Sequence, residues 1–302
     1  PLFARYANGV VTVQDLVSHP NNIFFVCSVT GSDAAKFGES PDSPFATVDY
    51  AVGKCTASKG DVIYVMPGHV ETFSTVALSP SQDVAGVQII GLGYGTLKPV
   101  FTYTHIDATW TISAANCRLE NVRLLGGVDN IKNGITISAD GDGAVTKDVE
   151  IVDGTAATEF LVGVLVAALA NDVVIDGLRM FGLIGGGTAA IAFAGASNNC
   201  VIKNCLIFGN HTAASIDMSA GACLDTFILD NLIVNEDAAT AGLCIKSHAS
   251  STGFVARNIA AGSKANTETV TGGTITHYAE NYGTDVAQTS AILTPKTVAT
   301  GW

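Results

Sequence analysis

From about Asp61 onward the chain consists of short runs in which apolar and polar residues alternate, and a four-residue mark recurs among them. The mark is an apolar residue (once Thr), a charged residue, then Asn, Asp or Gly, then an apolar residue. Leu119-Glu120-Asn121-Val122 and Ile202-Lys203-Asn204-Cys205 are two copies. The third positions of the six copies are residues 121, 148, 177, 204, 231 and 258, at spacings of 27, 29, 27, 27 and 27. Such regular self-similarity predicts an architecture of stacked units.

Each unit contains two or three short strands separated by turns rich in Gly, Asn and Ser. Alternating runs precede the marks, for example residues 135–137, 164–166 and 216–218. A unit of about 27 residues without a helix fits one coil of a β-solenoid. A leucine-rich repeat would need a regular Leu ladder, and a propeller blade needs about 40 residues. We therefore predict an all-β, right-handed parallel β-helix (solenoid) of about eight or nine coils over residues 61–287.

Stacked coils place equivalent residues in columns, because each strand pairs with its copy in the next coil. Recurring Ile, Val and Leu, among them Ile202 and Leu229, are expected to point into the centre. Asn tolerates left-handed backbone at low cost, and its side chain can hydrogen-bond along a column. The sequence therefore predicts an Asn ladder at one corner, formed by Asn121, Asn204, Asn231 and Asn258.

The residues before the repeats differ from them and predict a cap. Ser43 and Pro44 are typical of a helix start, with Ser at the N-cap and Pro at the first helical position. Apolar residues follow at helical spacing, namely Phe45, Val48, Ala51, Val52 and Cys55, and Gly60 ends the segment. We expect an N-terminal arm at 1–22, an N-terminal cap with a short helix at 23–60, and a C-terminal tail at 288–302.

Composition and charge exclude several classes of partner. Of 302 residues 48% are hydrophobic and 14% are charged, which disfavours disorder. The formal net charge is −12 and the chain has no basic run, so we expect no nucleic-acid partner. A polyanionic polysaccharide would be repelled at long range. No apolar run approaches the roughly 20 residues that a membrane helix needs, so no membrane partner is expected.

Seven cysteines are present, and no two are spaced as CxxC. The odd number and the apolar surroundings of Cys117, Cys200, Cys205 and Cys244 disfavour a disulfide framework or a zinc site. They favour folding in a reducing compartment. The first apolar stretch lacks the features of a signal peptide, so synthesis in a host cytoplasm without such a peptide is expected.

A search for catalytic residues yields little. Asp176 and Asp230 occupy equivalent marks two coils apart, but Lys203 lies between them in the expected column, which favours charge neutralisation over a glycosidase pair. Asp140 and Asp142 lack the spacing of a calcium loop. The six His residues are scattered, and His69 and His105 are expected at the surface or in loops. We therefore expect no catalytic, cofactor-binding or metal-binding residues, no cofactor, and no enzymatic activity.

One segment resembles a known family. Thr30-Gly31-Ser32-Asp33, residues 43–48 (SPFATV) and residues 60–71 (GDVIYVMPGHVE) follow in an order similar to the opening of pectate-lyase-like β-helix proteins. The resemblance covers roughly residues 24 to 71 and implies the same fold. It implies little about function, because that superfamily contains lyases, hydrolases and virion proteins.

The whole chain, with its arm at residues 1–20, resembles β-helix proteins encoded among tailed-phage and prophage structural genes. This resemblance implies a virion protein. The first hypothesis is a non-enzymatic capsid decoration (cement) protein, a homotrimer bound to the major capsid protein or another virion protein. The alternative is a tail spike or receptor-binding protein that binds or cleaves host polysaccharide. A free polysaccharide lyase is a third hypothesis, disfavoured by the lack of a basic cluster.

Overall fold

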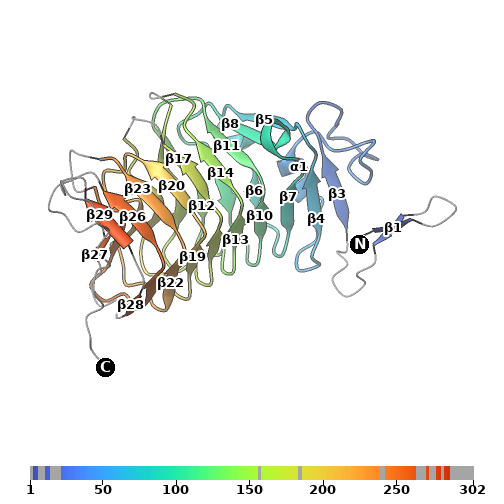
Figure 1. Ribbon diagram of the computed structural model, residues 1–302. Helices are drawn as coiled ribbons and strands as arrows, with labels where there is room; N and C mark the ends of the chain where they lie inside the picture. The colour runs from blue at the N-terminus through green and yellow to red at the C-terminus, as the bar shows by residue number, and fades with distance from the viewer. Residues whose placement is uncertain are drawn as a thin grey trace.

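The computed structural model describes residues 3–5, 11–13, 22–155, 158–182, 186–237, 242–262, 270–271, 277–279 and 282–285. It confirms the expected fold class, a right-handed parallel β-helix (Figure 1). Three long parallel sheets of ten, nine and eight strands run along the described part of the chain. The chain visits them in a fixed order, so each coil contributes one strand to every sheet.

The strands are grouped here as sheets 1, 2 and 3. Sheet 1 contains β3 (Ile23–Val26), β4 (Val62–Val65), β7 (Gln88–Gly91), β10 (Arg118–Glu120), β13 (Val145–Lys147), β16 (Val174–Asp176), β19 (Val201–Lys203), β22 (Thr226–Leu229), β25 (Gly253–Ala256) and β28 (His277–Ala279). Sheet 2 contains β5 (Val70–Phe73), β8 (Val100–Tyr103), β11 (Arg123–Gly126), β14 (Glu150–Val152), β17 (Arg179–Phe181), β20 (Leu206–Gly209), β23 (Leu232–Asn235), β26 (Ile259–Gly262) and β29 (Tyr282–Asp285). Sheet 3 contains β6 (Ser81–Gln82), β9 (Trp110–Ile112), β12 (Ile131–Ile137), β15 (Phe160–Val166), β18 (Ala189–Phe193), β21 (Ile216–Met218), β24 (Ile245–Ser247) and β27 (Val270–Thr271).

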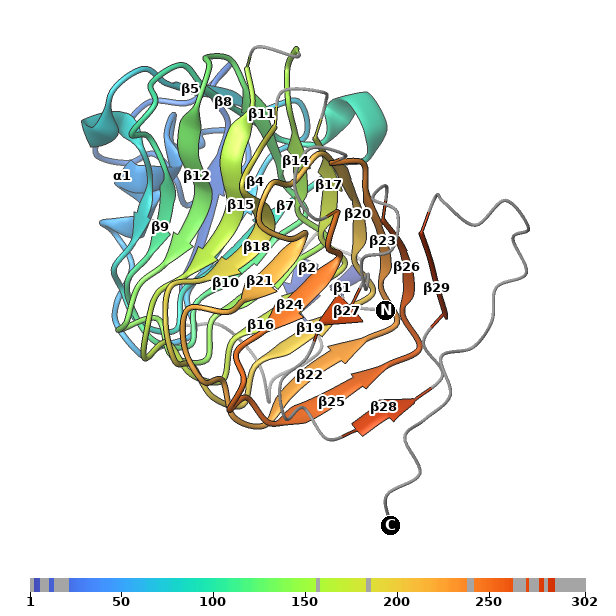
Figure 2. The ribbon, with the colours of Figure 1, turned by 90° about the vertical axis from the view of Figure 1, so that its left-hand side faces the viewer.

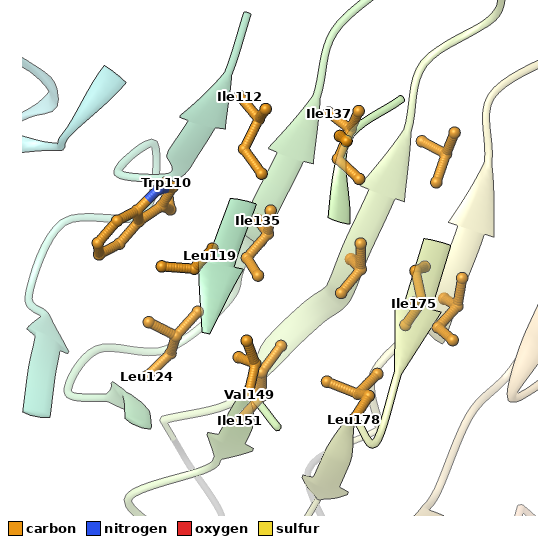
Figure 3. Close-up of a cluster of buried hydrophobic side chains, with 14 of the residues drawn as sticks. Trp110, Ile112, Leu119, Leu124, Ile135, Ile137, Val149, Ile151, Ile175 and Leu178 are labelled. Carbon is orange, nitrogen blue, oxygen red and sulfur yellow. The ribbon is translucent and has the colours of Figure 1, made fainter. Parts of the chain in front are cut away.

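The centre of the coils is a continuous apolar core. Period-2 alternation sends every second side chain inward, so Leu119, Ile175 and Ile202 on sheet 1 are fully buried. Leu124 and Ile151 of sheet 2 meet them from another side, and Figure 3 shows Leu119 and Ile175 together with Leu124 and Ile151 in the interior between the sheets. Burial of aliphatic side chains at about 25 cal/mol per Å² is the main stabilising contribution of such a stack.

Sheets 1 and 2 meet at a corner called corner 1–2. From β10 to β26 the chain turns there through only two residues, whereas residues 66–69 and 92–99 form longer connections in the first two coils. In four successive coils the first of these two turn residues is Asn121, Asp148, Gly177 and Asn204, and each has positive φ. This confirms the four expected turn positions. In the next two coils the left-handed residues are Asp230 and Arg257, so the expected positions 231 and 258 are wrong by one residue. The coil between the turn residues Asn204 and Asp230 is therefore one residue shorter than the 27-residue spacing of the recurring four-residue mark suggests.

This one-residue shift also changes which residues point inward. Lys203 pairs with Leu229, and Ile202 pairs with Ile228. Ile202 is buried as expected, but the expectation for Leu229 is wrong, because Ile228 occupies the buried position and Leu229 lies on the outer face of sheet 1.

The predicted Asn ladder exists only at the end of the stack. Asn231 and Asn258 are buried at the second position of corner 1–2, and the Nδ2 of Asn231 donates to the Oδ1 of Asn258 over 2.8 Å. Asn121 and Asn204 are instead left-handed turn residues whose Nδ2 groups donate to Gly91 O and to Asp176 Oδ1. The ladder expected to run through all four is therefore wrong for Asn121 and Asn204.

A second ladder, which the sequence reasoning missed, lies at the corner between sheets 3 and 1 (corner 3–1). The Oδ1 of Asp142 accepts the backbone N–H of Asn171 at 2.6 Å. The Oδ1 of Asn171 accepts the N–H of Asn198, and that of Asn198 accepts the N–H of Leu224. Asp142 is thus a structural residue of this corner, in line with its exclusion as part of a calcium loop.

The N-terminal segment contains one α-helix, α1 (Val48–Val52), and the expected start at Ser43 and Pro44 is wrong. Thr47 is the N-cap and accepts the N–H of Tyr50, while Asp33 holds the N–H and hydroxyl of Thr47. Phe45 lies before the helix, in a parallel bridge to Val26. The apolar face of α1 is buried against β3 and β4.

The remaining elements are short. Two 3₁₀ turns, η1 (Val76–Leu78) and η2 (Gly95–Leu97), follow early strands, and β1 (Phe3–Arg5) pairs antiparallel with β2 (Val11–Val13) within the expected arm. The expected tail at 288–302 lies outside the described residues. Among the described residues the five-residue α1 is the longest helix, and none reaches the length and hydropathy of a membrane span.

Candidate functional site

Two columns of outward-facing side chains flank corner 1–2, one on each sheet, and they form the candidate functional surface. Column 1, on sheet 1, contains Tyr64, Ile90, Glu120, Lys147, Asp176, Lys203 and Leu229. Column 2, on sheet 2, contains Val70, Val100, Arg123, Glu150, Arg179, Leu206, Leu232 and Ile259. Figure 2 shows the last coils in front, with β25 and β26 on the two sides of this corner.

The middle of column 1 carries charges of alternating sign. Lys147 Nζ lies 3.4 Å from Glu120 Oε1, and Lys203 Nζ lies 3.4 Å from Asp176 Oδ2. This pattern confirms that charges on the outer face neutralise one another along the column. The expected place of Asp230 in it is wrong, because the neighbour of Lys203 is Leu229, whereas Asp230 lies at the corner and pairs with Arg257 at 2.7 Å.

Column 2 has the opposite sign at three of the four charged levels. Arg123, Glu150 and Arg179 lie three residues beyond Glu120, Lys147 and Asp176, in the same coils. Arg123 contacts Glu150 at 2.9 Å, and Lys98 Nζ lies 4.0 Å from the same carboxylate. Burial lowers the pKa of Lys98, while the Glu150 charge opposes that shift. Among the described residues, no ion pair joins column 1 to column 2.

Both columns are apolar at their ends. At one end lie Tyr64, Ile90, Val70 and Val100, and at the other Leu229, Leu206, Leu232 and Ile259. Val70 is 53% exposed, Leu232 36% and Ile259 49%. Large aliphatic side chains standing in rows on a sheet are unusual at a free surface, and rows of this kind mark protein–protein contact sites.

A further apolar column stands beside column 2 on sheet 2. It contains Leu125, Val152, Phe181, Phe208 and Val234, all partly exposed. The rings of Phe181 and Phe208 are parallel to within 7°, with centroids 6.1 Å apart. Arg179 lies over Phe181, its guanidinium carbon 5.6 Å from the ring centroid. The faces of the two rings are therefore directed along the column.

The corner between sheets 2 and 3 (corner 2–3) contains a pair of carboxyl groups. Glu159 directly precedes β15 and is only 5% exposed, and its Oε2 has no hydrogen-bond partner. Burial, together with the nearby negative charge of Asp129, raises the pKa of Glu159. A pKa raised by burial and by a second carboxylate is the property that a carboxyl group needs to act as a general acid.

A buried histidine lies at the same corner, several coils further on. His211 is 1% exposed, its Nδ1 lies 3.0 Å from Ser215 Oγ, and its backbone is held by Asn235. Burial lowers the pKa of His211 to about 4, although the Asp237 charge opposes the shift. Because Ser215 and Asp237 are also buried, this group is inaccessible to a substrate and braces two coils.

His69 lies in the loop between β4 and β5, in line with the expected loop position, but it is not at the surface. His69 is fully buried, accepts the N–H of Ser28 at Nδ1, and contacts Glu71 through Nε2 at 3.1 Å. It therefore joins the N-terminal segment to the first coils. His105 is half-buried in the loop before β9, consistent with its expected place, and accepts the N–H of Asp107.

All seven cysteines are free thiols, and five of them are buried. Burial raises the pKa of Cys200, Cys205 and Cys244 to about 12, so these thiols stay protonated and act as small apolar residues. In the described part of the chain no three His, Cys, Asp or Glu side chains are grouped so that they could hold a metal ion.

No family model and no curated protein matches the chain. Two solved structures are similar in fold. One is a rhamnogalacturonan lyase, with a TM-score of 0.44 and 12% identity, covering 86% of this chain and 87% of that one. The other is a GH136 lacto-N-biosidase from Eubacterium ramulus, with a TM-score of 0.42 and 12% identity, covering 87% of this chain and 67% of that one.

This comparison corrects one expectation. Both similar structures are enzymes, so the prediction that the chain is not an enzyme is contradicted and is withdrawn. At 12% identity the likeness concerns the fold alone and assigns neither an activity nor a substrate to this chain.

Proposed function

We propose that the chain is a structural component of a tailed-phage virion, a homotrimeric capsid decoration protein that binds the major capsid protein. The virion assignment starts from the resemblance of the whole chain, carried by residues 1–33, to β-helix proteins of phage structural genes. The proposed place of the chain is the virion, after synthesis in the host cytoplasm. The parallel stack supports this role because it is a stiff rod with regular side faces.

The observation that carries the proposal is the set of apolar rows on the outside of sheet 2. Phe181, Phe208, Leu232 and Ile259 face outward on consecutive coils. A protein that acts alone in solution gains nothing from such rows, because they expose apolar area at a cost of about 25 cal/mol per Å². A protein that is assembled into a larger particle buries them.

The further apolar column on sheet 2 favours a protein partner. The rings of Phe181 and Phe208 are parallel, with centroids 6.1 Å apart, and stand in one row with partly exposed aliphatic side chains. Aromatic and aliphatic side chains in one row suit contact with apolar protein side chains.

A second candidate, a tail spike that binds or cleaves host polysaccharide, is favoured by one observation. Glu159 has a raised pKa beside Asp129, as expected for a general acid next to a second carboxyl group. Glu159 is 5% exposed, so this candidate also requires that a glycosidic oxygen reach a largely buried carboxyl group. This candidate predicts that Glu159→Gln abolishes glycan cleavage while leaving the fold intact.

Quantitative mass spectrometry of purified particles tests the proposal. A decoration protein is expected in copy numbers comparable with the major capsid protein and cross-linked to it. A few copies per particle, cross-linked to tail proteins, would contradict capsid decoration and favour the spike. Complete absence from particles would refute the virion assignment altogether. Assays of glycan release by the wild type and by Glu159→Gln separate the second candidate.

A further inference from the structure

Columns 1 and 2 are complementary to each other level by level, where a level is one coil. At the first two levels both columns carry a side chain that is mainly apolar, such as Tyr64 in column 1 and Val70 in column 2. At the next three levels the signs are opposite, as Glu120 with Arg123. At the seventh level Leu229 corresponds to Leu232. The only unmatched level is the sixth, where Lys203 corresponds to Leu206.

We propose that corner 1–2 is the surface through which copies of this chain associate, side by side and parallel, with the corner directed toward a common rotation axis. In such an arrangement one flank of the corner faces the next copy and the other flank faces the previous copy. Rotation about an axis parallel to the stack leaves every level at its own height. Column 1 of one copy therefore meets column 2 of its neighbour at the same level, and the matched pairs come together.

The charges at this corner suit self-association. The chain as a whole carries −12, but columns 1 and 2 together contain four basic and three acidic residues. Exposed carboxylates are more numerous at corner 3–1, at Asp140, Asp142, Asp172 and Asp225, than at corner 1–2, which has Asp148 and the Arg257-paired Asp230. Copies joined at corner 1–2 therefore meet at a nearly neutral surface and keep their acidic corners apart, which limits repulsion between like charges.

Two other arrangements fit the same surface less well. An antiparallel pair of sheet 1 faces would also match alternating charges, but it would leave the exposed Val70, Leu232 and Ile259 in water. An antiparallel pair of sheet 2 faces would set Arg123 near Leu206, an ion against an apolar side chain. The parallel arrangement matches three of the four charged levels, leaving Lys203 against Leu206, and it also covers the apolar ends of both columns.

This inference deepens the homotrimer within the proposed function, and it is tested on the purified full chain. Light scattering after size exclusion gives the mass, which is expected at three times 31.0 kDa. Leu232→Lys places a charge among the apolar pairs and is expected to give the mass of one chain. Leu165→Lys, on the outer face of sheet 3, is the matched control and is expected to keep the mass of three chains. Circular dichroism verifies that both variants fold.

Cross-linking tests the orientation of the copies. Leu229→Cys and Leu232→Cys chains with different mass tags, when co-expressed and oxidised, are expected to form a mixed disulfide, because the two positions meet at one level. Ile90→Cys with Leu229→Cys is expected to form none, since they lie five levels apart on one face. A link in that second pair would show antiparallel copies and overturn the inference. So would a wild type with the mass of one chain, or a Leu232→Lys variant with the mass of three.

The two proposals fail separately. A chain that trimerises through this corner but is absent from particles refutes only the virion role. A chain that is found on particles but is monomeric when purified and unlinked within the particle refutes only the inference about corner 1–2.

Discussion

The side-chain amide of Asn231 donates a hydrogen bond to the Oδ1 of Asn258, one coil further on, over 2.8 Å. Both side chains are almost fully buried. The Oδ1 of Asn231 also accepts the N–H of Cys205 in the preceding coil, at 2.9 Å. Asn231 therefore satisfies backbone and side-chain groups of three successive coils, at a corner where the sheet hydrogen bonds are interrupted.

Replacing Asn231 with Ala is expected to destabilise the chain by about 1–3 kcal/mol, because buried partners such as Cys205 N–H lose their hydrogen bonds. Asn204→Gly is the matched control. It removes an exposed amide from the same corner and keeps a residue that accepts positive φ, so a change below about 0.5 kcal/mol is expected. Urea denaturation measures both. Equal losses would contradict the buried ladder.

Ile202→Asp is expected to prevent folding, because it buries an unpaired carboxylate in the centre of the stack. Leu229→Asp, one coil away, is expected to leave the β-helix folded, since Leu229 faces outward beside Lys203. Soluble yield and the circular dichroism melting curve distinguish the two variants. A Leu229→Asp variant that fails to fold would restore the unshifted register.

Gly253 and Gly60 both have positive φ, at 135° and 72°, but their surroundings differ. A Cβ on Gly253 would lie 1.9 Å from the carbonyl oxygen of Thr226, whereas a Cβ on Gly60 would meet nothing within 4 Å. Gly60→Ala is therefore expected to cost only the backbone strain of about 1–2 kcal/mol. Gly253→Ala is expected to separate β22 from β25 and to lower the melting temperature much further. Similar melting temperatures would disprove the close strand contact.

The free energy of unfolding is expected to fall as the pH decreases from about 6.5 to 4, partly because of the protonation of His211. Its pKa in the folded chain is about 4, below the ordinary value of 6.5, so in this range the unfolded chain takes up the proton first. One such group contributes a slope of up to about 1.4 kcal/mol per pH unit. His211→Gln should flatten the decrease, as measured by urea midpoints at pH 7 and 5. His105→Gln, at a half-buried loop position, is the control. An unchanged slope in His211→Gln would contradict a buried neutral imidazole.

The fold class was predictable because the corner residues recur in the sequence at the same spacing as the coils of the stack. The shift at Asp230 was not, since Asp230 and Asn231 both tolerate left-handed backbone and both fit the repeating mark. The second ladder had a readable signal: Asp142, Asn171 and Asn198 are spaced by 29 and 27 residues, the same spacings as 148, 177 and 204.

The candidate surface was less accessible from the sequence. Alternating charges in one column were predicted, but the matching column on sheet 2 depends on which residues face outward from a second sheet. The helix start depended on a tertiary contact, because Asp33 holds Thr47 as the cap and Phe45 pairs with Val26 instead of joining the helix. The burial of His69 likewise follows from Ser28, 41 residues away in the chain.

The strict parallel stacking makes length an adjustable property of this molecule. Each strand pairs only with its copies in the coil above and the coil below. Removal of residues 178–204 would therefore join Gly177 to Cys205, the residue that follows the equivalent turn one coil later. The rod would become shorter by one strand spacing, about 4.8 Å, with its cross-section unchanged. Related chains with different numbers of coils would therefore differ in the length of the rod, in steps of one strand spacing.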